Sequence, residues 1–195
     1  MGRTRSYDED AVLRGAMHAF RRKGYQAVSI RDLEEATGLK AGSIYNSFGD
    51  KAGLFDAAFA HYNQAVLQKR IDRYAAREAG LGGLRDLFLT LLWEPDGGSF
   101  GCLITNMAVE LGSEEAGNHH VEAGLGTLRR AFAERLEEAR AAGELRPPIR
   151  PERAAMKLLA LYQGILVLVR AGYDKAALKR LITDEFTNME IAHDA

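Results

Sequence analysis

Apolar residues recur at helical spacing along most of the chain, whereas the strict alternation of a half-buried strand is almost absent. In residues 8–23, for instance, Val12, Ala16 and Phe20 fall on one face of a helix. Further helices are expected over residues 29–38, 40–48, 50–74, 84–93, 102–111, 118–142 and 152–171, and from 174 onward. The pattern therefore predicts an all-α fold of about nine helices.

Residues typical of helix ends flank these segments. Candidate starts are Ser29 with Asp32 as a capping box, Asp50 and Asp174, and candidate stops are Gly24 and Gly38. The helix over 29–38 is expected to turn Ile30, Leu33 and Ala36 inward. The four prolines all follow Leu92, at breaks between helical stretches.

The two short helices over 29–38 and 40–48, joined by a tight turn at Gly38, match a helix-turn-helix. Gly38 permits the positive φ that such a turn needs, and Leu33, Leu39 and Ile44 are expected to hold the two helices together. The outward residues of the second helix are small or polar: Lys40, Ala41, Gly42, Ser43, Tyr45, Asn46 and Ser47. Such a surface fits a DNA major groove. The alternative is a simple helical hairpin with Tyr45 and Phe48 as core aromatics.

Individual side chains in this region suit different DNA contacts. Asn46 and Lys40 suit base edges, whereas Ser29, Tyr45 and Lys51 suit phosphates. Lys51 also follows Asp50 at a helix start, where backbone N–H groups favour a phosphate. The candidate DNA-binding residues are Ser29, Arg31, Lys40, Ala41, Gly42, Ser43, Tyr45, Asn46, Ser47 and Lys51.

Composition supports a folded protein but adds little on function. The 195 residues are 47% hydrophobic, and 26 Lys and Arg nearly balance 27 Asp and Glu, so the overall charge lacks the basic signature of many nucleic-acid binders. No apolar run reaches the roughly 20 residues that span a bilayer, and the polar N-terminus excludes a secretory signal. A cytoplasmic protein is therefore expected. The single cysteine, Cys102, excludes an intrachain disulfide and a thiolate zinc cluster.

The series Phe20, Gly24, Ser29 to Gly38 and Gly42 to Phe55 resembles the N-terminal DNA-binding domain of the TetR family of repressors. Glu34 departs from that pattern, in which a small alanine is common. The resemblance implies a DNA-binding domain over residues 1–50 and a helical ligand-binding and dimerisation domain over residues 51–195. It also implies a homodimer on a double-stranded palindromic operator, with half-sites about 34–36 Å apart, and release from that operator by a small-molecule inducer.

The last two predicted helices are apolar on more than one side, which indicates burial on more than one side. The resemblance implies that they form a four-helix bundle across a two-fold axis. The expected interface residues are Leu158, Leu161, Ile165, Leu168, Leu178, Leu181, Ile182 and Phe186. The alternative is burial within one monomer.

Candidates for the ligand pocket are Phe88, Leu92, Trp93, Phe100, Cys102, Met107 and Tyr162, with Asn106 as a polar anchor. The alternative is that they only fill the core, and residues 95–99 form either a gate or a connector. Cys102 follows Gly101 at a helix start, which favours a reactive thiolate. A redox or electrophile sensor and a buried, inert thiol both remain open.

No catalytic or cofactor site is expected. Residues 80–83 are glycine-rich but lack the Lys-Ser/Thr of a phosphate-binding loop, and Cys102 has no identifiable His or Asp partner. His119 and His120 point about 100° apart on a helix, so we expect no metal there. A helical enzyme is therefore disfavoured, whereas a DNA-binding protein without ligand control stays open. The inducer, the operator and the sign of regulation cannot be read from the sequence.

Overall fold

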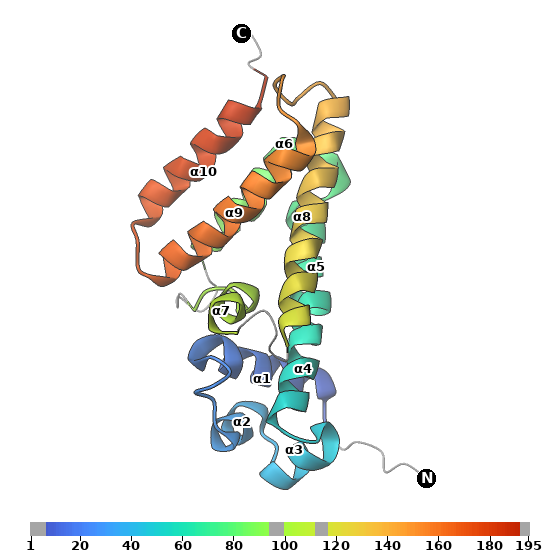
Figure 1. Ribbon diagram of the computed structural model, residues 1–195, viewed down its shortest axis with the longest axis vertical. Helices are drawn as coiled ribbons and strands as arrows, with labels where there is room; N and C mark the ends of the chain where they lie inside the picture. Colours follow the sequence, from blue (N-terminus) through green and yellow to red (C-terminus); the bar gives the residue numbers. More distant parts are fainter. Residues whose placement is uncertain (1–6, 94–99, 112–116, 192–195) are drawn as a thin grey trace. The chain divides into compact units, whose positions relative to one another are not determined.

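The computed structural model describes residues 7–93, 100–111 and 117–191. Helices make up most of this part of the chain (Figure 1), and within it one isolated β-bridge pairs Leu145 with Glu190. If α4, η1 and α5 are counted as one helical segment, the described residues hold nine α-helical elements. The predicted all-α fold is therefore confirmed.

The elements follow the chain with short connections. The helices are α1 Glu9–Lys23, α2 Ile30–Thr37, α3 Ala41–Phe48, α4 Lys51–His61, the π-helix η1 Tyr62–Leu67, α5 Gln68–Tyr74, the 3₁₀-helix η2 Arg77–Ala79, α6 Gly80–Leu89, the 3₁₀-helix η3 Thr90–Leu92, α7 Leu103–Glu110, α8 Asn118–Ala141, α9 Pro151–Arg170 and α10 Lys175–Met189. Among the described residues, none of these helices is both long and apolar enough to cross a membrane.

Most helix ends lie where the sequence predicts them. Asp50 and Asp174 cap α4 and α10 through their side chains, and Ser29 and Asp32 form the expected capping box at α2. The long helix after Asp50 departs from the prediction, because the turn from Tyr62 to Leu67 is π-helical. Local caps follow from single residue types, whereas a π-helical turn has no comparably simple sequence signal.

The chain divides into two compact units, residues 1–66 with 102–123 and residues 67–101 with 124–195. The first unit contains α1 to α4, α7 and the start of α8. The second contains α5, α6, most of α8, α9 and α10. The functional boundary expected near residue 50 stays a prediction.

Helix α1 forms the centre of the first unit and packs against α2, α4 and α7. Its Phe20 ring meets Phe55 of α4 edge to face, with centroids 5.0 Å apart. Gly15 lets α2 approach closely, because a Cβ at this position would lie 2.1 Å from the carbonyl oxygen of Ala36. The expected inward position of the Ala36 side chain is wrong. It is exposed, because the backbone at Ala36, rather than its methyl group, meets α1.

An aromatic cluster forms the core of the second unit. Phe88 of α6 lies 5.5 Å from Phe132 of α8, 5.2 Å from Tyr162 of α9 and 5.3 Å from Phe186 of α10, measured between ring centroids. Four aromatic side chains, one from each of four helices, therefore pack together around Phe88. Edge-to-face and tilted pairs of this kind stabilise a core beyond the area they bury.

Candidate nucleic-acid interface

The geometry of α2 and α3 is that of a helix-turn-helix. Leu33 of α2 and Ile44 of α3 are fully buried, so each short helix is held by one apolar side chain at its centre. Gly38 adopts φ 73° and ψ 0° at the end of α2, the left-handed conformation that the turn requires. Thr37 reinforces the turn, because its hydroxyl donates to the carbonyl of Leu33 and accepts from the amide of Leu39.

The outer face of α3 is available to a partner. Gly42, Ser43, Tyr45 and Asn46 are exposed, as is Lys40 just before the helix. Tyr45 is 48% exposed, so the alternative in which it is a core aromatic is excluded. Small side chains around one tyrosine and one asparagine leave room for a DNA groove to approach the helix backbone.

Glu34 ties the start of α3 to α2. Its Oε1 accepts a hydrogen bond of 2.8 Å from the amide of Ala41, the first residue of α3. The residue at the N-cap position of α3, Lys40, makes no side-chain cap of its own. Glu34 therefore provides from a neighbouring helix the acceptor that a helix start lacks. The sequence shows this residue only as a departure from the family pattern.

The start of α2 is fixed by a small charged network. The Asp32 carboxylate accepts from the amide and the hydroxyl of Ser29, at 2.9 and 2.8 Å, and from Nζ of Lys23 at 2.6 Å. These hydrogen bonds, that of Lys23 above all, hold the pKa of Asp32 well below its usual range. Ser29 is exposed but its hydroxyl already serves the cap, so any phosphate contact would share that hydroxyl.

Lys51 begins α4 beside the turn between α1 and α2. Its Nζ lies 4.8 Å from the ring centroid of Tyr25 and donates to the carbonyl of Gln26 at 3.3 Å. The preceding Asp50 caps α4 by accepting from the amide of Gly53 at 2.8 Å. A Cβ at Gly53 would lie 1.9 Å from the carbonyl oxygen of Phe48, so this glycine permits the tight step from α3 to α4. The ammonium of Lys51 is thereby held at the edge of the helix-turn-helix.

Helix α7 holds the same turn from another side. Glu110 accepts from the amides of Tyr25 and Gln26, at 2.9 and 2.7 Å. Asn106 donates through Nδ2 to the carbonyl of Arg21, in the last turn of α1, at 2.9 Å. The sequence predicted Asn106 as a pocket anchor and gave no signal for Glu110. Both are positioning residues of the first unit, since they fix the backbone between α1 and α2.

The residues proposed for a ligand pocket are divided between the two units, and the pocket they would form stays a prediction. Cys102, Asn106 and Met107 belong to the first unit, where Cys102 is buried with its Sγ 3.0 Å from Oη of Tyr62. In the second unit, Phe88, Leu92 and Tyr162 are buried, Phe100 is half-buried and Trp93 is 66% exposed beneath Nζ of Lys175. The gate expected at 95–99 lies outside the described residues.

The residues proposed for a dimer interface divide by exposure. Leu158, Ile165, Leu178, Ile182 and Phe186 are buried inside the second unit, Leu161 and Leu168 are half-buried, and Leu181 is 44% exposed. Four residues missed by the sequence analysis form an exposed stripe on α9, which we call the α9 stripe: Met156, Ala160, Gly164 and Val167. Both faces of α9 are apolar, so periodicity did not show which face is buried.

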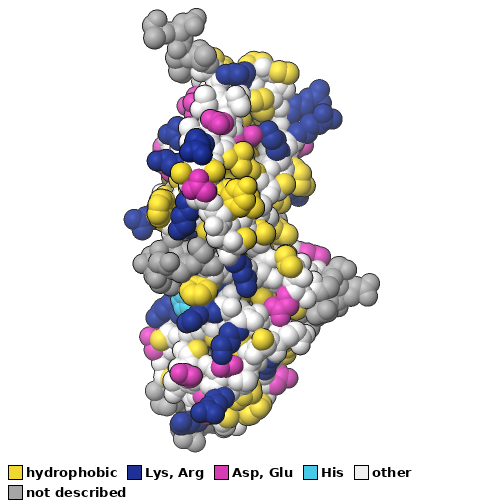
Figure 2. Space-filling view, turned by 90° about the vertical axis from the view of Figure 1, so that its left-hand side faces the viewer, with side chains coloured by type: hydrophobic (Ala, Val, Ile, Leu, Met, Phe, Trp, Pro, Cys, Tyr) yellow, Lys and Arg dark blue, Asp and Glu magenta, His cyan; other side chains and the backbone are white. Residues whose placement is uncertain are grey.

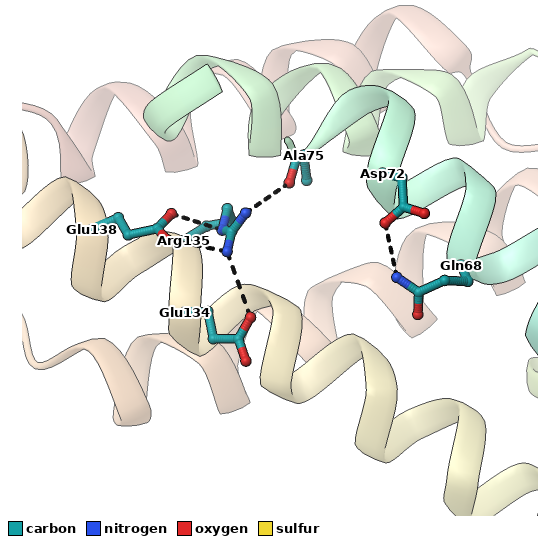
Figure 3. A network of polar contacts seen from close by, with 6 residues as sticks. All are labelled: Gln68, Asp72, Ala75, Glu134, Arg135 and Glu138. Atoms are coloured by element: carbon teal, nitrogen blue, oxygen red, sulfur yellow. Dashed lines mark hydrogen bonds and ion pairs between the residues drawn. The ribbon is translucent and has the colours of Figure 1, made fainter. Parts of the chain in front are cut away.

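A cavity of about 540 Å³ lies in the second unit, between α5 and α8. Its lining residues are Gln68, Ile71, Asp72, Ala75, Ala76, Glu78, Thr127, Arg130, Ala131, Glu134 and Arg135. Figure 3 shows the polar contacts that some of these residues make. Arg135 is 7% exposed, and its guanidinium donates to the carbonyl of Ala75 at 3.3 Å and pairs with Glu138 at 2.9 Å.

Comparison with known proteins supports the helix-turn-helix assignment. Residues 12–58 match the model of bacterial regulatory proteins of the tetR family, and residues 87–184 match that of the tetracyclin repressor-like C-terminal domain. The chain belongs to the TetR family. It is therefore a DNA-binding transcriptional regulator whose helix-turn-helix is formed by α2 and α3.

Two relatives of this TetR-family regulator are named as repressors. The transcriptional repressor ComR of Escherichia coli K12 is 31% identical over 97% of this chain and 91% of its own length. The repressor AcnR of Corynebacterium jeikeium is 27% identical over 80% of this chain and 77% of its own. A solved structure of the TetR-family regulator CifR, a cysteine mutant in complex with 26-bp double-strand operator DNA, has a TM-score of 0.82 at 27% identity and covers 96% of this chain and 100% of the CifR chain.

Proposed function

We propose that this TetR-family regulator is a homodimeric repressor that binds a palindromic operator and leaves it when a small molecule binds. The observation that carries the proposal is the exposed face of α3, with Gly42, Ser43, Tyr45 and Asn46 on a helix held by buried Ile44. The operator complex of CifR and the repressor function of ComR support it.

We assign two kinds of DNA contact to this face. Asn46 and Lys40 read base edges, because an amide and an ammonium match donor and acceptor patterns in the major groove. Tyr45, Lys51, Arg31 and Ser29 contact phosphates and set the register of the protein on the duplex. Close approach of the duplex to the backbone of α3 is possible because the side chains there are small, at Ala41, Gly42, Ser43 and Ser47.

The dimer surface is assigned to α9 and α10. Met156, Ala160, Gly164 and Val167 are exposed at spacings of four, four and three residues, so they line one side of α9. Small Ala160 and Gly164 at the centre of the α9 stripe let a second helix approach closely. On the face of the second unit that Figure 2 shows, hydrophobic side chains gather among Lys and Arg. A two-fold axis through such a surface makes the self-complementary contact that a palindrome requires.

We place the effector in the cavity between α5 and α8. Its volume of about 540 Å³ lies within the range usual for small-molecule sites. Asp72, Glu134, Arg130 and Arg135 give it a charged wall, which suits an effector with polar groups better than a purely apolar one. The effector must bind the DNA-free state more tightly than the DNA-bound state, because equal affinity for both would shift nothing.

Selection of DNA fragments by the purified full-length protein tests the DNA-binding part of this proposal. Recovery of one palindromic sequence, with affinity that falls steeply as salt is raised, is expected. Asn46→Ala should cost about 1–3 kcal/mol and relax the preference at one base position. Lys51→Ala should weaken all sequences alike and reduce the salt slope by about one. Lys69→Ala, an exposed lysine of α5, is the matched control.

Enrichment of no sequence, or equal binding by Asn46→Ala and wild type, would contradict the assignment of α3.

The effector is tested separately, by the thermal shift that small polar compounds produce. A ligand at 100 times its Kd stabilises the native state by about 2.7 kcal/mol. The absence of any stabilising compound that also releases DNA would favour a regulator without ligand control.

A further inference from the structure

Three side chains with metal-binding atoms converge in the first unit. Asp56 lies on α4, and His119 and His120 lie in the first turn of α8, beside α4 (Figure 1). Nε2 of His120 is 2.7 Å and Nε2 of His119 is 3.4 Å from the same carboxylate oxygen, Oδ1 of Asp56. All three ligand atoms lie within 4.8 Å of one another.

This arrangement departs from the expectation that adjacent histidines on a helix cannot share an ion. Their Cβ atoms do diverge, but both imidazole rings turn toward Asp56, and the ring centroids are only 3.9 Å apart. The two side chains thus bring the rings together although their Cβ atoms point in different directions. The partner that draws them together lies more than 60 residues earlier in the chain, so neighbouring sequence gives no sign of it.

We propose that Asp56, His119 and His120 form a binding site for a divalent first-row transition metal, with Zn²⁺ as the representative ion. The two imidazole nitrogens are borderline ligands, and together with one carboxylate oxygen they suit Zn²⁺ and Cu²⁺ rather than Mg²⁺ or Ca²⁺, whose sites consist of oxygen ligands. Four-coordinate Zn²⁺ with bonds of about 2.0–2.2 Å separates its ligand atoms by roughly 3.3 Å. Nε2 of His119 and Oδ1 of Asp56 already lie about this far apart. The shorter distance, from Nε2 of His120 to the same oxygen, lengthens when the ion replaces the proton of that hydrogen bond.

The site combines a fixed ligand with two accessible ones. The His120 side chain is 12% exposed, and its ring stacks on Phe59 with centroids 5.3 Å apart. The carbonyl of His120 also accepts a hydrogen bond of 2.9 Å from Asn63. His119 and Asp56 are 65% and 56% exposed, which lets a hydrated ion reach the site and leaves a fourth position for water.

Metal binding would connect two helices of the same unit. Asp56 lies in the second turn of α4, the helix that directly follows α3, whereas both histidines belong to α8. An ion shared by these residues cross-links α4 to α8 and stabilises the state in which the three groups converge. The inference depends only on this local geometry and not on the operator or the effector proposed above.

Metal titration of tag-free, chelator-stripped full-length protein tests the site. Zn²⁺ is titrated in competition with a chromophoric chelator, and Co²⁺ reports the coordination environment through its visible absorption. One ion per chain is expected, with affinity that falls as acid protonates the histidines. His119→Ala, His120→Ala and Asp56→Asn should each weaken binding by about tenfold or more, because even supporting residues cost this much.

His61→Gln is the matched control. His61 is also paired with a carboxylate, since its Nδ1 lies 3.8 Å from Asp10, but no second imidazole joins that pair among the described residues. This variant should bind Zn²⁺ as wild type does, and circular dichroism should confirm that all variants fold. Binding by wild type no tighter than by the His119→Ala, His120→Ala double variant would overturn the proposal. An equal loss in His61→Gln would overturn it as well, by locating the ion elsewhere.

Discussion

A single carboxylate on α2 determines how α3 begins. Glu34 accepts from the amide of Ala41, and Lys40 provides no cap of its own. We expect Glu34→Ala to lower the free energy of unfolding by about 1 kcal/mol, the usual cost of losing a helix cap. Glu34→Gln should cost less, because the amide oxygen can still accept. Chemical denaturation measures both effects.

Glu35→Ala is the control for this substitution, because Glu35 is the exposed neighbour on the same helix. Its effect should stay within about 0.5 kcal/mol. Hydrogen exchange supplies an independent check, since loss of the cap should accelerate exchange at Ala41. Unchanged protection of that amide in Glu34→Ala would show that α3 does not depend on Glu34.

Asp32 makes the start of α2 sensitive to acid. Hydrogen bonds from Lys23 and Ser29 lower its pKa in the folded state, so the folded protein binds fewer protons than the unfolded one as the pH approaches the ordinary Asp value. The stabilisation is fully present above about pH 5 and is lost as the pH falls through about 4 and below. Wild type should therefore lose more stability than Asp32→Asn on acidification. Urea unfolding at several pH values measures the difference, and parallel acid profiles would contradict the assignment.

At the scale of elements, α7 holds the segment between α1 and α2. Glu110 accepts from two consecutive amides, those of Tyr25 and Gln26. Because the acceptor is charged and the Tyr25 amide is half-buried, Glu110→Ala should destabilise the first unit by about 1–3 kcal/mol. Glu110→Gln should fall between that variant and wild type.

Hydrogen exchange resolves this effect by residue. The amides of Tyr25 and Gln26 should lose protection in Glu110→Ala, whereas those around the Phe88 cluster in the second unit should not change. A uniform loss throughout the chain would instead indicate global destabilisation. The position of the Lys51 ammonium should also change, since it donates to the carbonyl of Gln26. Operator affinity is therefore expected to fall together with protection at this turn.

Sequence reasoning succeeded where a single residue and its near neighbours determine the structure. Ser29 with Asp32, Gly38 and Asp50 set helix ends through contacts within a few residues, so their roles could be predicted. It failed where the partner is distant in the chain, as for Glu110 with Tyr25. For the candidate site, the exposed residues of α3 followed from periodicity, but the contact of Glu34 with Ala41 required the packing of two helices.

The same limit applies to the two apolar faces of α9 in the second unit. Leu158 and Ile165 are buried, whereas Met156 and Val167 on the same helix are exposed. All four are apolar, so the helical pattern shows that α9 has two apolar faces without showing which face meets its own unit. The exposed face is the new information that the structure adds, and it changes which residues we assign to a dimer.

At the scale of the whole molecule, a palindromic operator requires two copies of α3, and hence a dimer. The α9 stripe offers a direct way to test how that dimer forms. Gly164 is exposed at its centre, and a Cβ at this position would meet nothing within 4 Å inside the protomer. Arginine is also a better helix former than glycine by up to about 1 kcal/mol. Gly164→Arg should therefore leave the protomer folded while it blocks a helix of a second copy.

Sedimentation velocity should find Gly164→Arg as a monomer at concentrations at which wild type is a dimer. Operator affinity should fall by about 10²–10⁴-fold, because each half-site then binds alone and the gain from linked binding is lost. Gly82→Arg is the control, since Gly82 is a helical glycine of α6 with equally open space around its Cβ position. A folded Gly164→Arg protein that remains dimeric would place the interface away from the α9 stripe. A monomer that keeps full operator affinity would instead show that the dimer is not what joins the two half-sites.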